Sequence, residues 1–134
     1  MEKKYKLTDK IELIARTMYR IEALRDGEHF KKGEKGGWIE SEKNLSQKGD
    51  CWISKDAQIF GNAQVYENAQ VYGNARVRGN AVVRGNAVVF GKARVYGDAR
   101  VFGDAQVFGK ARVSMSKIEK SKDSVPKNKI IEGD

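Results

Sequence analysis

Apolar and polar residues recur with a period of six through the centre of this chain. Between residues 57 and 116, ten consecutive hexads begin with Ala and carry Ile or Val at the third position. The fourth position is mostly aromatic, the fifth is Gly in eight hexads, and the sixth is mostly Asn or Asp, as in Ala69-Gln70-Val71-Tyr72-Gly73-Asn74. A strict repeat of this length is typical of a parallel β-helix.

Each hexad has the composition of one short strand and one corner. Side chains alternate along a strand, so the first and third residues share a side, where β-branched Val packs well. Ala suits the tight space inside a corner, and Gly-Asn or Gly-Asp tolerates positive φ. Three hexads then close a triangular coil, and we expect residues 18 apart to lie one above the other, at a rise of about 4.8 Å.

This stacking sorts the variable positions into three outer faces, and the first is basic. It carries a ladder of Arg76, Arg94 and Arg112, with Arg78 and Tyr96 beside it. Arg binds phosphate or carboxylate with two parallel hydrogen bonds and stacks on aromatic rings. We predict that these five residues bind an anionic partner. The alternative is a charged face that only contacts solvent.

The third face carries no charge. It presents the rings of Tyr72, Phe90 and Phe108, together with Val88. A contiguous apolar face is unusual on a soluble monomer, so we interpret these four residues as a self-association surface and expect a homo-oligomer. The alternative is cross-strand stacking that only stabilises the sheet.

The chain divides into three segments by composition. We predict an N-terminal cap over 1–36, a β-helix over 37–116, and a charged tail or end cap over 117–134. Within the cap, the apolar spacing from Asp9 to Leu24 suits a helix, whereas the alternation after Tyr19 suits a strand.

Charge and cysteine content limit the function classes. The formal net charge is +8, and the repeat contributes most of the excess, with 8 basic and 3 acidic residues. Such a surface favours anionic partners. Cys51 is the only cysteine, which fits a reducing cytosol. We find neither an apolar run near 18 residues nor an apolar signal core, so we expect no membrane association and no secretion.

Few residues suit catalysis. The repeat lacks His, and its carboxylates are Glu67, Asp98 and Asp104, of which the two Asp occupy corner positions. His29 lies in a charged stretch, and Cys51 has the parity of a small buried residue. We therefore predict no catalytic residue, no metal site and no cofactor.

Two resemblances extend these predictions. The repeated Ile or Val with Ala two residues earlier resembles the hexapeptide-repeat proteins, which implies a left-handed parallel β-helix. Tyr19-Arg20-Ile21-Glu22-Ala23-Leu24-Arg25-Asp26, Gly36-Gly37-Trp38-Ile39-Glu40 and Gly49-Asp50-Cys51-Trp52 resemble the N-terminal cap of a bacterial and prophage group labelled hexapeptide-repeat transferases. That resemblance implies a strand at Tyr19–Asp26.

Together these observations predict an all-β, left-handed β-helix with a small β-rich cap and no enzymatic activity. We expect a phage or prophage protein of the bacterial cytoplasm, for example an inhibitor of a host complex. Its partner would be a protein or an anionic surface in preference to a specific nucleic acid. The alternative is an acyltransferase that uses acyl-CoA, a chemistry that requires a general base, usually His.

Overall fold

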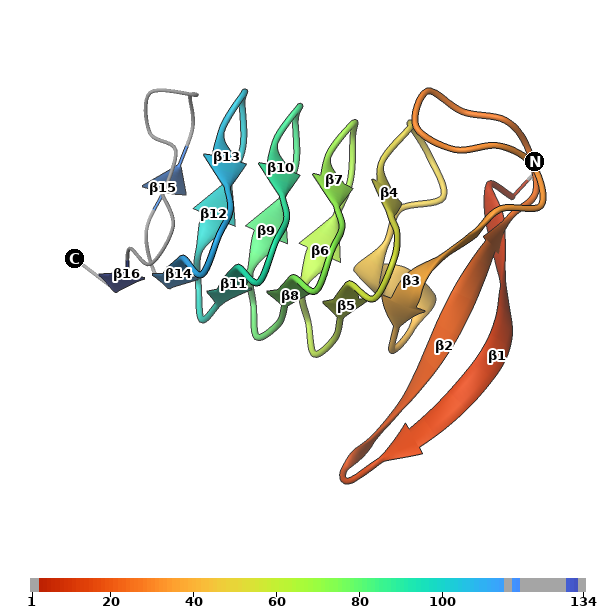
Figure 1. Ribbon diagram of the computed structural model, residues 1–134, viewed down its shortest axis with the longest axis horizontal. Coiled ribbons are helices and arrows are strands. Elements are labelled where there is room, and N and C mark those ends of the chain that lie inside the picture. The colour runs from red at the N-terminus through yellow and green to blue at the C-terminus, as the bar shows by residue number, and fades with distance from the viewer. Residues whose placement is uncertain (1–2, 115–116, 119–129, 133–134) are drawn as a thin grey trace.

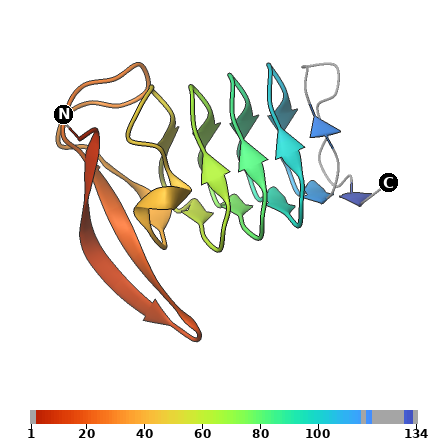
Figure 2. The same ribbon diagram turned by 180° about the vertical axis from the view of Figure 1, so that it is seen from behind.

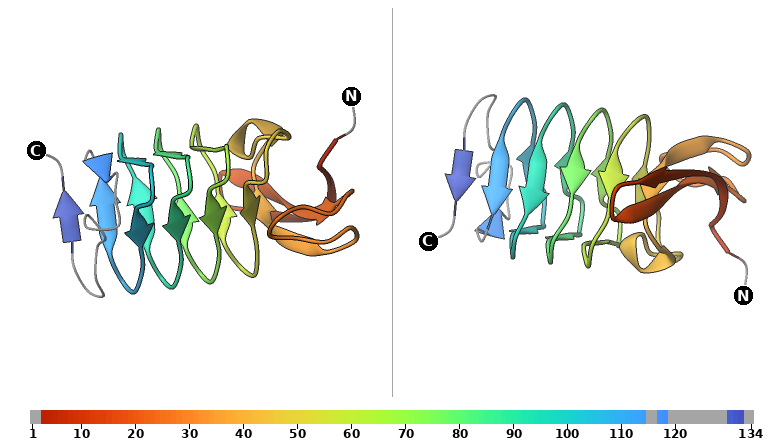
Figure 3. Two further views of the ribbon diagram at one scale, coloured as in Figure 1. Left: turned by 90° about the horizontal axis from the view of Figure 1, so that it is seen from above. Right: turned by 90° about the horizontal axis from the view of Figure 1, so that it is seen from below.

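The computed structural model describes residues 3–114, 117–118 and 130–132 of the chain. An antiparallel hairpin of β1 (Tyr5–Leu13) and β2 (Arg16–Ala23) precedes a parallel β-solenoid of about four turns (Figure 1). Viewed from above and below, the coils stack along one axis, with the hairpin at one end and β16 at the other (Figure 3).

The solenoid strands are short. A longer strand, β3 (Lys35–Ile39), and a single 3-10 turn, η1 (Glu42–Asn44), lead into them. The short solenoid strands are β4 (Trp52–Ile53), β5 (Gln58–Ile59), β6 (Gln64–Val65), β7 (Gln70–Val71), β8 (Arg76–Val77), β9 (Val82–Val83), β10 (Val88–Val89), β11 (Arg94–Tyr96), β12 (Arg100–Val101), β13 (Gln106–Val107), β14 (Arg112–Ser114), β15 (Lys117–Ile118) and β16 (Ile130–Glu132).

The strands form three sheets, one for each side of the coil. Sheet A has the order β1-β2-β3-β5-β8-β11-β14-β16, sheet B the order β15-β12-β9-β6, and sheet C the order β13-β10-β7-β4. Gln58 pairs with Arg76, and Arg94 pairs with both Arg76 and Arg112, so these successive coils are 18 residues apart. This is the stacking distance predicted from the sequence, and the predicted basic face and uncharged face each lie on one sheet, A and C. The spacing differs at the two ends, where Trp38 pairs with Gln58 and Arg100 pairs with Lys117.

The core is formed by two kinds of small side chain. Each Ala that begins a hexad, from Ala57 to Ala111, is buried, as is each third residue from Ile59 to Val113. Because no single coil encloses these side chains, they are buried only by the coils above and below.

Corner residues at the fifth position of the hexads adopt positive φ, in the left-handed region. Gly85 has φ 70°, and a Cβ at this position would lie 2.8 Å from the backbone N of Gly103 in the next coil. The preceding residue in the same column of corners is Glu67, with φ 63°. Its Oε1 accepts the N–H of Gly85 at 2.8 Å, so this carboxylate caps a corner.

The hairpin confirms the strand alternative in the N-terminal segment and excludes the helix. Leu13 pairs with Arg16 across a two-residue turn, and β2 pairs with β3, which joins the hairpin to sheet A. The helical spacing misleads because Ile14 is 98% exposed at the hairpin tip, whereas Met18 and Ile21 are buried. Figure 2 shows the hairpin projecting from the body of the solenoid.

Lys4 and Tyr5 anchor the start of β1 to the first coil. The buried Lys4 Nζ donates to the carbonyl oxygen of Cys51 at 2.7 Å and lies 3.0 Å from Cys51 Sγ. Burial lowers the pKa of the Lys4 ammonium and raises the pKa of the Cys51 thiol. The Tyr5 hydroxyl donates to the carbonyl oxygen of Leu45 at 2.5 Å. Cys51 is thus a buried packing residue, as expected.

The two tryptophans have different surroundings. Trp52 is buried and stacks on Phe30, with ring centroids 4.3 Å apart. Trp38 lies on sheet A under the guanidinium of Arg20.

Part of the predicted C-terminal tail continues the stack. β15 pairs with β12, and β16 pairs with β14, both in parallel. The rest of the segment 117–134, namely 119–129 and 133–134, lies outside the described residues.

Candidate anion-binding face

Three arginines form a ladder on the outer surface of sheet A. Arg76, Arg94 and Arg112 lie on the adjacent strands β8, β11 and β14, in register with one another. Their neighbours in the chain, Val77, Val95 and Val113, point into the core. Because side chains alternate along a strand, the three guanidinium groups are held outside, roughly 4.8 Å apart at their backbones.

A shallow hollow lies beside this ladder. It has a volume of about 260 Å³ and is lined by Arg78, Arg94, Tyr96 and Arg112. The Cζ atom of Arg78 lies 4.6 Å from the centroid of the Tyr96 ring, a cation–π contact. Four of the five residues predicted for this face therefore line one hollow, whereas Arg76 does not and is exposed on the same sheet.

These arginines are not neutralised by residues 3–114. No carboxylate in that range lies within 4.0 Å of the guanidinium nitrogens of Arg76, Arg78, Arg94 or Arg112. The arginines at the N-terminal end of sheet A differ, since Arg16 lies 3.5 Å from Glu40 and Arg20 lies 3.8 Å from Asp56. The unpaired positive charge is therefore concentrated over β8, β11 and β14.

Two lysines extend the positive surface, and the sequence reasoning missed them. Lys92 and Lys110 occupy the corner before β11 and the corner before β14, and both are exposed. They follow Asn74 in that column of corners, where Asn and Asp are the common residues. The signal was available in the sequence, as a change from Asn to Lys two residues before Arg94 and Arg112.

The aromatic residues predicted on the third face form a stack on sheet C. The rings of Tyr72 and Phe90 have centroids 5.1 Å apart with planes at 8°, and those of Phe90 and Phe108 have centroids 5.4 Å apart with planes at 11°. Val88 lies beside them on β10 and is half-buried. The structure thus brings all four predicted residues together on one face.

The titratable residues considered for catalysis are dispersed. Asp98 Oδ1 accepts a hydrogen bond from Asn80 Nδ2 at 3.4 Å, which fits a corner residue. His29 lies in the loop before β3, with Nε2 3.4 Å from Glu28 Oε1. The described residues contain no cluster of three His, Cys, Asp or Glu side chains able to hold a metal ion. They also contain no helix long and apolar enough to span a membrane.

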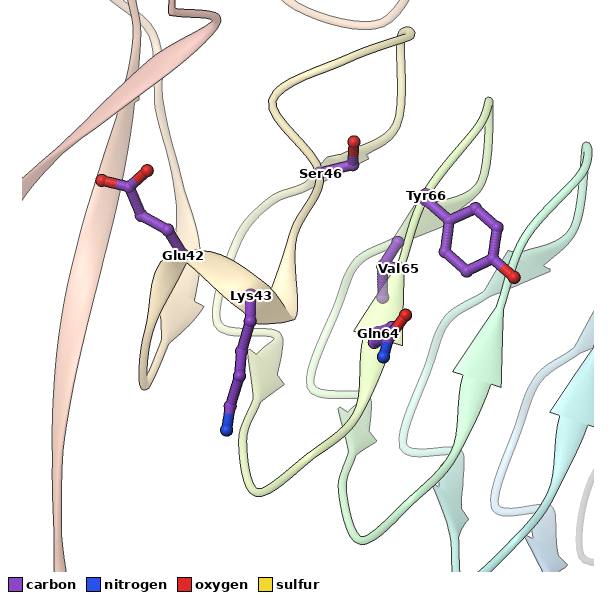
Figure 4. Close-up of a pocket in the computed structure, with 6 residues that line it drawn as sticks. All are labelled: Glu42, Lys43, Ser46, Gln64, Val65 and Tyr66. Atoms are coloured by element: carbon purple, nitrogen blue, oxygen red, sulfur yellow. The ribbon is translucent and has the colours of Figure 1, made fainter.

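A second hollow lies at the N-terminal end of sheet B. It has a volume of about 360 Å³ and is lined by Glu42, Lys43, Ser46, Gln64, Val65 and Tyr66. Figure 4 shows Glu42 and Lys43 extending from η1 in different directions, with Tyr66 projecting from the neighbouring coil. Both charges already have partners, because Glu42 Oε2 lies 3.1 Å from Lys3 Nζ and Lys43 Nζ donates to Asn62 Oδ1 at 3.2 Å. This hollow was not predicted from the sequence, and both of its charged side chains already contact other residues.

The stacked parallel strands and the buried Ala and Val columns define a β-solenoid repeat protein. Two stretches of the chain, 69–85 and 93–109, match the family model described as the YdcK beta solenoid repeat. Both stretches lie in the coils that carry the basic face and the aromatic stack. No curated protein matches the chain.

Proposed function

We propose that this protein is a non-enzymatic binding protein that presents the outer surface of sheet A to an anionic macromolecule. The observation that carries the proposal is the in-register ladder of Arg76, Arg94 and Arg112 beside a hollow lined by arginine and tyrosine. Like charges one coil apart repel one another, and an anionic partner removes that cost by accepting hydrogen bonds from the guanidinium groups.

The partner that we propose is a protein or another anionic surface, in preference to a specific nucleic-acid sequence. A sequence-specific protein needs side chains placed to contact the edges of bases in a groove, and no recognised nucleic-acid module accompanies the ladder. Lys92 and Lys110 support the proposal because they widen the positive surface without adding base-reading geometry.

The proposal includes finer features of the fold and setting. The solenoid would be left-handed and of the hexapeptide-repeat type, in line with the resemblance of residues 57–116. The protein would act in the bacterial cytoplasm as a phage-encoded inhibitor of a host complex. A rigid surface without a catalytic base suits such a role, because binding alone would block the target.

Charge reversal tests the basic face. In the variant with Arg76, Arg94 and Arg112 all changed to Glu, we expect affinity for heparin, used as a polyanion probe, to fall by about a hundredfold or more. The circular dichroism spectrum should remain that of the native chain, because all three side chains point away from the core. Binding is measured by calorimetry at constant salt concentration.

A matched control separates the face from net charge. The variant with Lys6, Lys31 and Lys32 changed to Glu carries the same change in charge at exposed positions away from the ladder. We expect it to retain most of the heparin affinity. Equal losses in the two variants would show that only net charge matters, and unchanged binding by the ladder variant would contradict the proposed function.

We also propose self-association through sheet C, supported by the uncharged stack of Tyr72, Phe90 and Phe108. Phe90→Glu places a charge at the centre of that stack, so we expect it to convert an oligomer into a monomer in light scattering. Phe102→Glu, on sheet B, is the control and should leave the oligomer intact. A monomeric wild-type chain whose mass is unchanged by Phe90→Glu would contradict this proposal.

A further inference from the structure

The environment of Tyr96 differs from that of the other stacked rings. On sheet C, the ring of Tyr72 is covered by that of Phe90, and the ring of Phe90 by that of Phe108. On sheet A, Arg78 covers Tyr96 from one side, and the residue in register on the other side is Ser114. A serine side chain is too small to cover an aromatic ring. Tyr96 is half-buried, and it lines the hollow together with three arginines.

The charge and the aromatic lining of this hollow suit part of one nucleotide unit. Its volume of about 260 Å³ is slightly below the roughly 300 Å³ at the lower limit of small-molecule sites. Arg94 and Arg112 lie on adjacent strands at one side of it, where guanidinium groups can donate pairs of hydrogen bonds to phosphate oxygens. The Tyr96 ring supplies a surface on which a base can stack.

Three arginines lie over aromatic rings on the outer surface of sheet A. Besides the Arg78–Tyr96 pair, the Cζ atom of Arg20 lies 4.5 Å from the centroid of the Trp38 ring, and that of Arg16 lies 4.1 Å from the centroid of the Phe60 ring. The cations of these two pairs already contact Asp56 and Glu40. The track of positive charge is therefore open to a ligand only over β8, β11 and β14, where Lys92 and Lys110 extend it.

A positively charged track with an aromatic ring at a hollow is the combination that binds single-stranded nucleic acid without sequence preference. An acidic protein would use the arginines but would gain little from the ring. In a duplex, the faces of the bases are stacked inside and do not reach a side chain at the surface.

We propose that sheet A binds single-stranded nucleic acid, with one base stacked on Tyr96 and the adjoining phosphates bound by Arg94 and Arg112. This inference rests on the proposed function, since a strand bound without sequence preference is an anionic surface, and it adds the chemistry of the anion. In this arrangement the base stacks on the Tyr96 ring in the way that one aromatic ring stacks on the next on sheet C.

The test is fluorescence anisotropy with the full chain and a labelled 15-nucleotide oligothymidylate. We expect Tyr96→Ala to weaken binding about tenfold and Tyr96→Phe to retain it, because stacking needs the ring and not the hydroxyl. Phe102→Ala is the matched control, since it removes an arginine-stacked ring from sheet B, where Arg84 Cζ lies 4.7 Å from that ring. It should bind as the wild type does.

Two further measurements separate stacking from charge. An abasic strand of the same length should bind more weakly than oligothymidylate and should be insensitive to Tyr96→Ala. Arg112→Ala should reduce the slope of log affinity against log salt concentration by about 0.7, the value for one phosphate contact of a single strand.

The outcomes distinguish this inference from the proposed function. The nucleotide site is wrong, and the anion-binding face stands, in either of two cases. In the first, heparin and oligothymidylate bind but Tyr96→Ala has no effect. In the second, the abasic strand or a polyglutamate peptide binds as tightly as oligothymidylate. If none of these probes binds, both proposals are wrong.

Discussion

Val83→Asp is expected to prevent this chain from folding, whereas Val82→Asp, one residue earlier, is expected to change the free energy of unfolding by less than about 1 kcal/mol. Val83 is fully buried among the stacked Val side chains, where an ionised carboxylate would have no partner. Such a substitution costs at least about 4 kcal/mol, a large share of the roughly 5–15 kcal/mol that stabilises a typical domain.

Val82 is the matched control because it has the same side chain on the same strand but points outward. It is half-buried on sheet B and pairs with Arg100 in the next coil, so an Asp there would face a cation. Circular dichroism shows whether Val83→Asp folds at all, and urea unfolding gives the free energy of unfolding of Val82→Asp and of the wild type. The inward and outward assignment of the two valines would be contradicted if the variants had equal stability.

The second large effect concerns a corner. Gly85→Ala is expected to lower the free energy of unfolding by about 2–4 kcal/mol, because φ at this residue is 70° and the left-handed region alone costs an L-residue about 1–2 kcal/mol. The added Cβ would also lie 2.8 Å from the backbone N of Gly103 and 3.2 Å from its O, atoms that are held by the stack.

Glu67→Gly, in the same column of corners, is the control for Gly85→Ala. It relieves a non-glycine φ of 63° and removes the carboxylate that accepts the N–H of Gly85, so the two effects oppose each other. We expect a net change within about 1 kcal/mol. Thermal unfolding that showed Gly85→Ala to be as stable as the wild type would mean that the corner does not need glycine.

The sequence predicted the architecture of the solenoid because each hexad satisfies a local and a stacking requirement at once. Ala and Val mark the inside, Gly marks positive φ, and residues 18 apart are brought into register by the closure of the coil. The ladder of Arg76, Arg94 and Arg112 followed from that spacing alone. The hairpin was harder to predict, since the apolar residues from Ile11 to Ile21 fit two periods and only the pairing of β1 with β2 distinguishes them.

Contacts between segments that are distant in the sequence could not be predicted. Lys4 lies beside Cys51 because the start of β1 returns to the first coil, a contact between residues 47 apart. Trp52 is at an outward position of sheet C and is nevertheless buried, because Phe30 from the loop before β3 covers it. Lys92 and Lys110 were visible in the hexad pattern, but their relevance depends on which face their corner adjoins.

The sequence by itself determined which side chains point inward and which residues share a face, because a repeat of constant length has one way to place its buried positions. Only the tertiary structure decided which charges on those faces remain unpaired. Arg16 and Arg20 contact Glu40 and Asp56, whereas Arg94 and Arg112 border an open hollow with Tyr96. The physical reason is that neutralisation depends on distances of a few ångströms between side chains from separate segments, and such distances exist only after the hairpin has packed against the first coils.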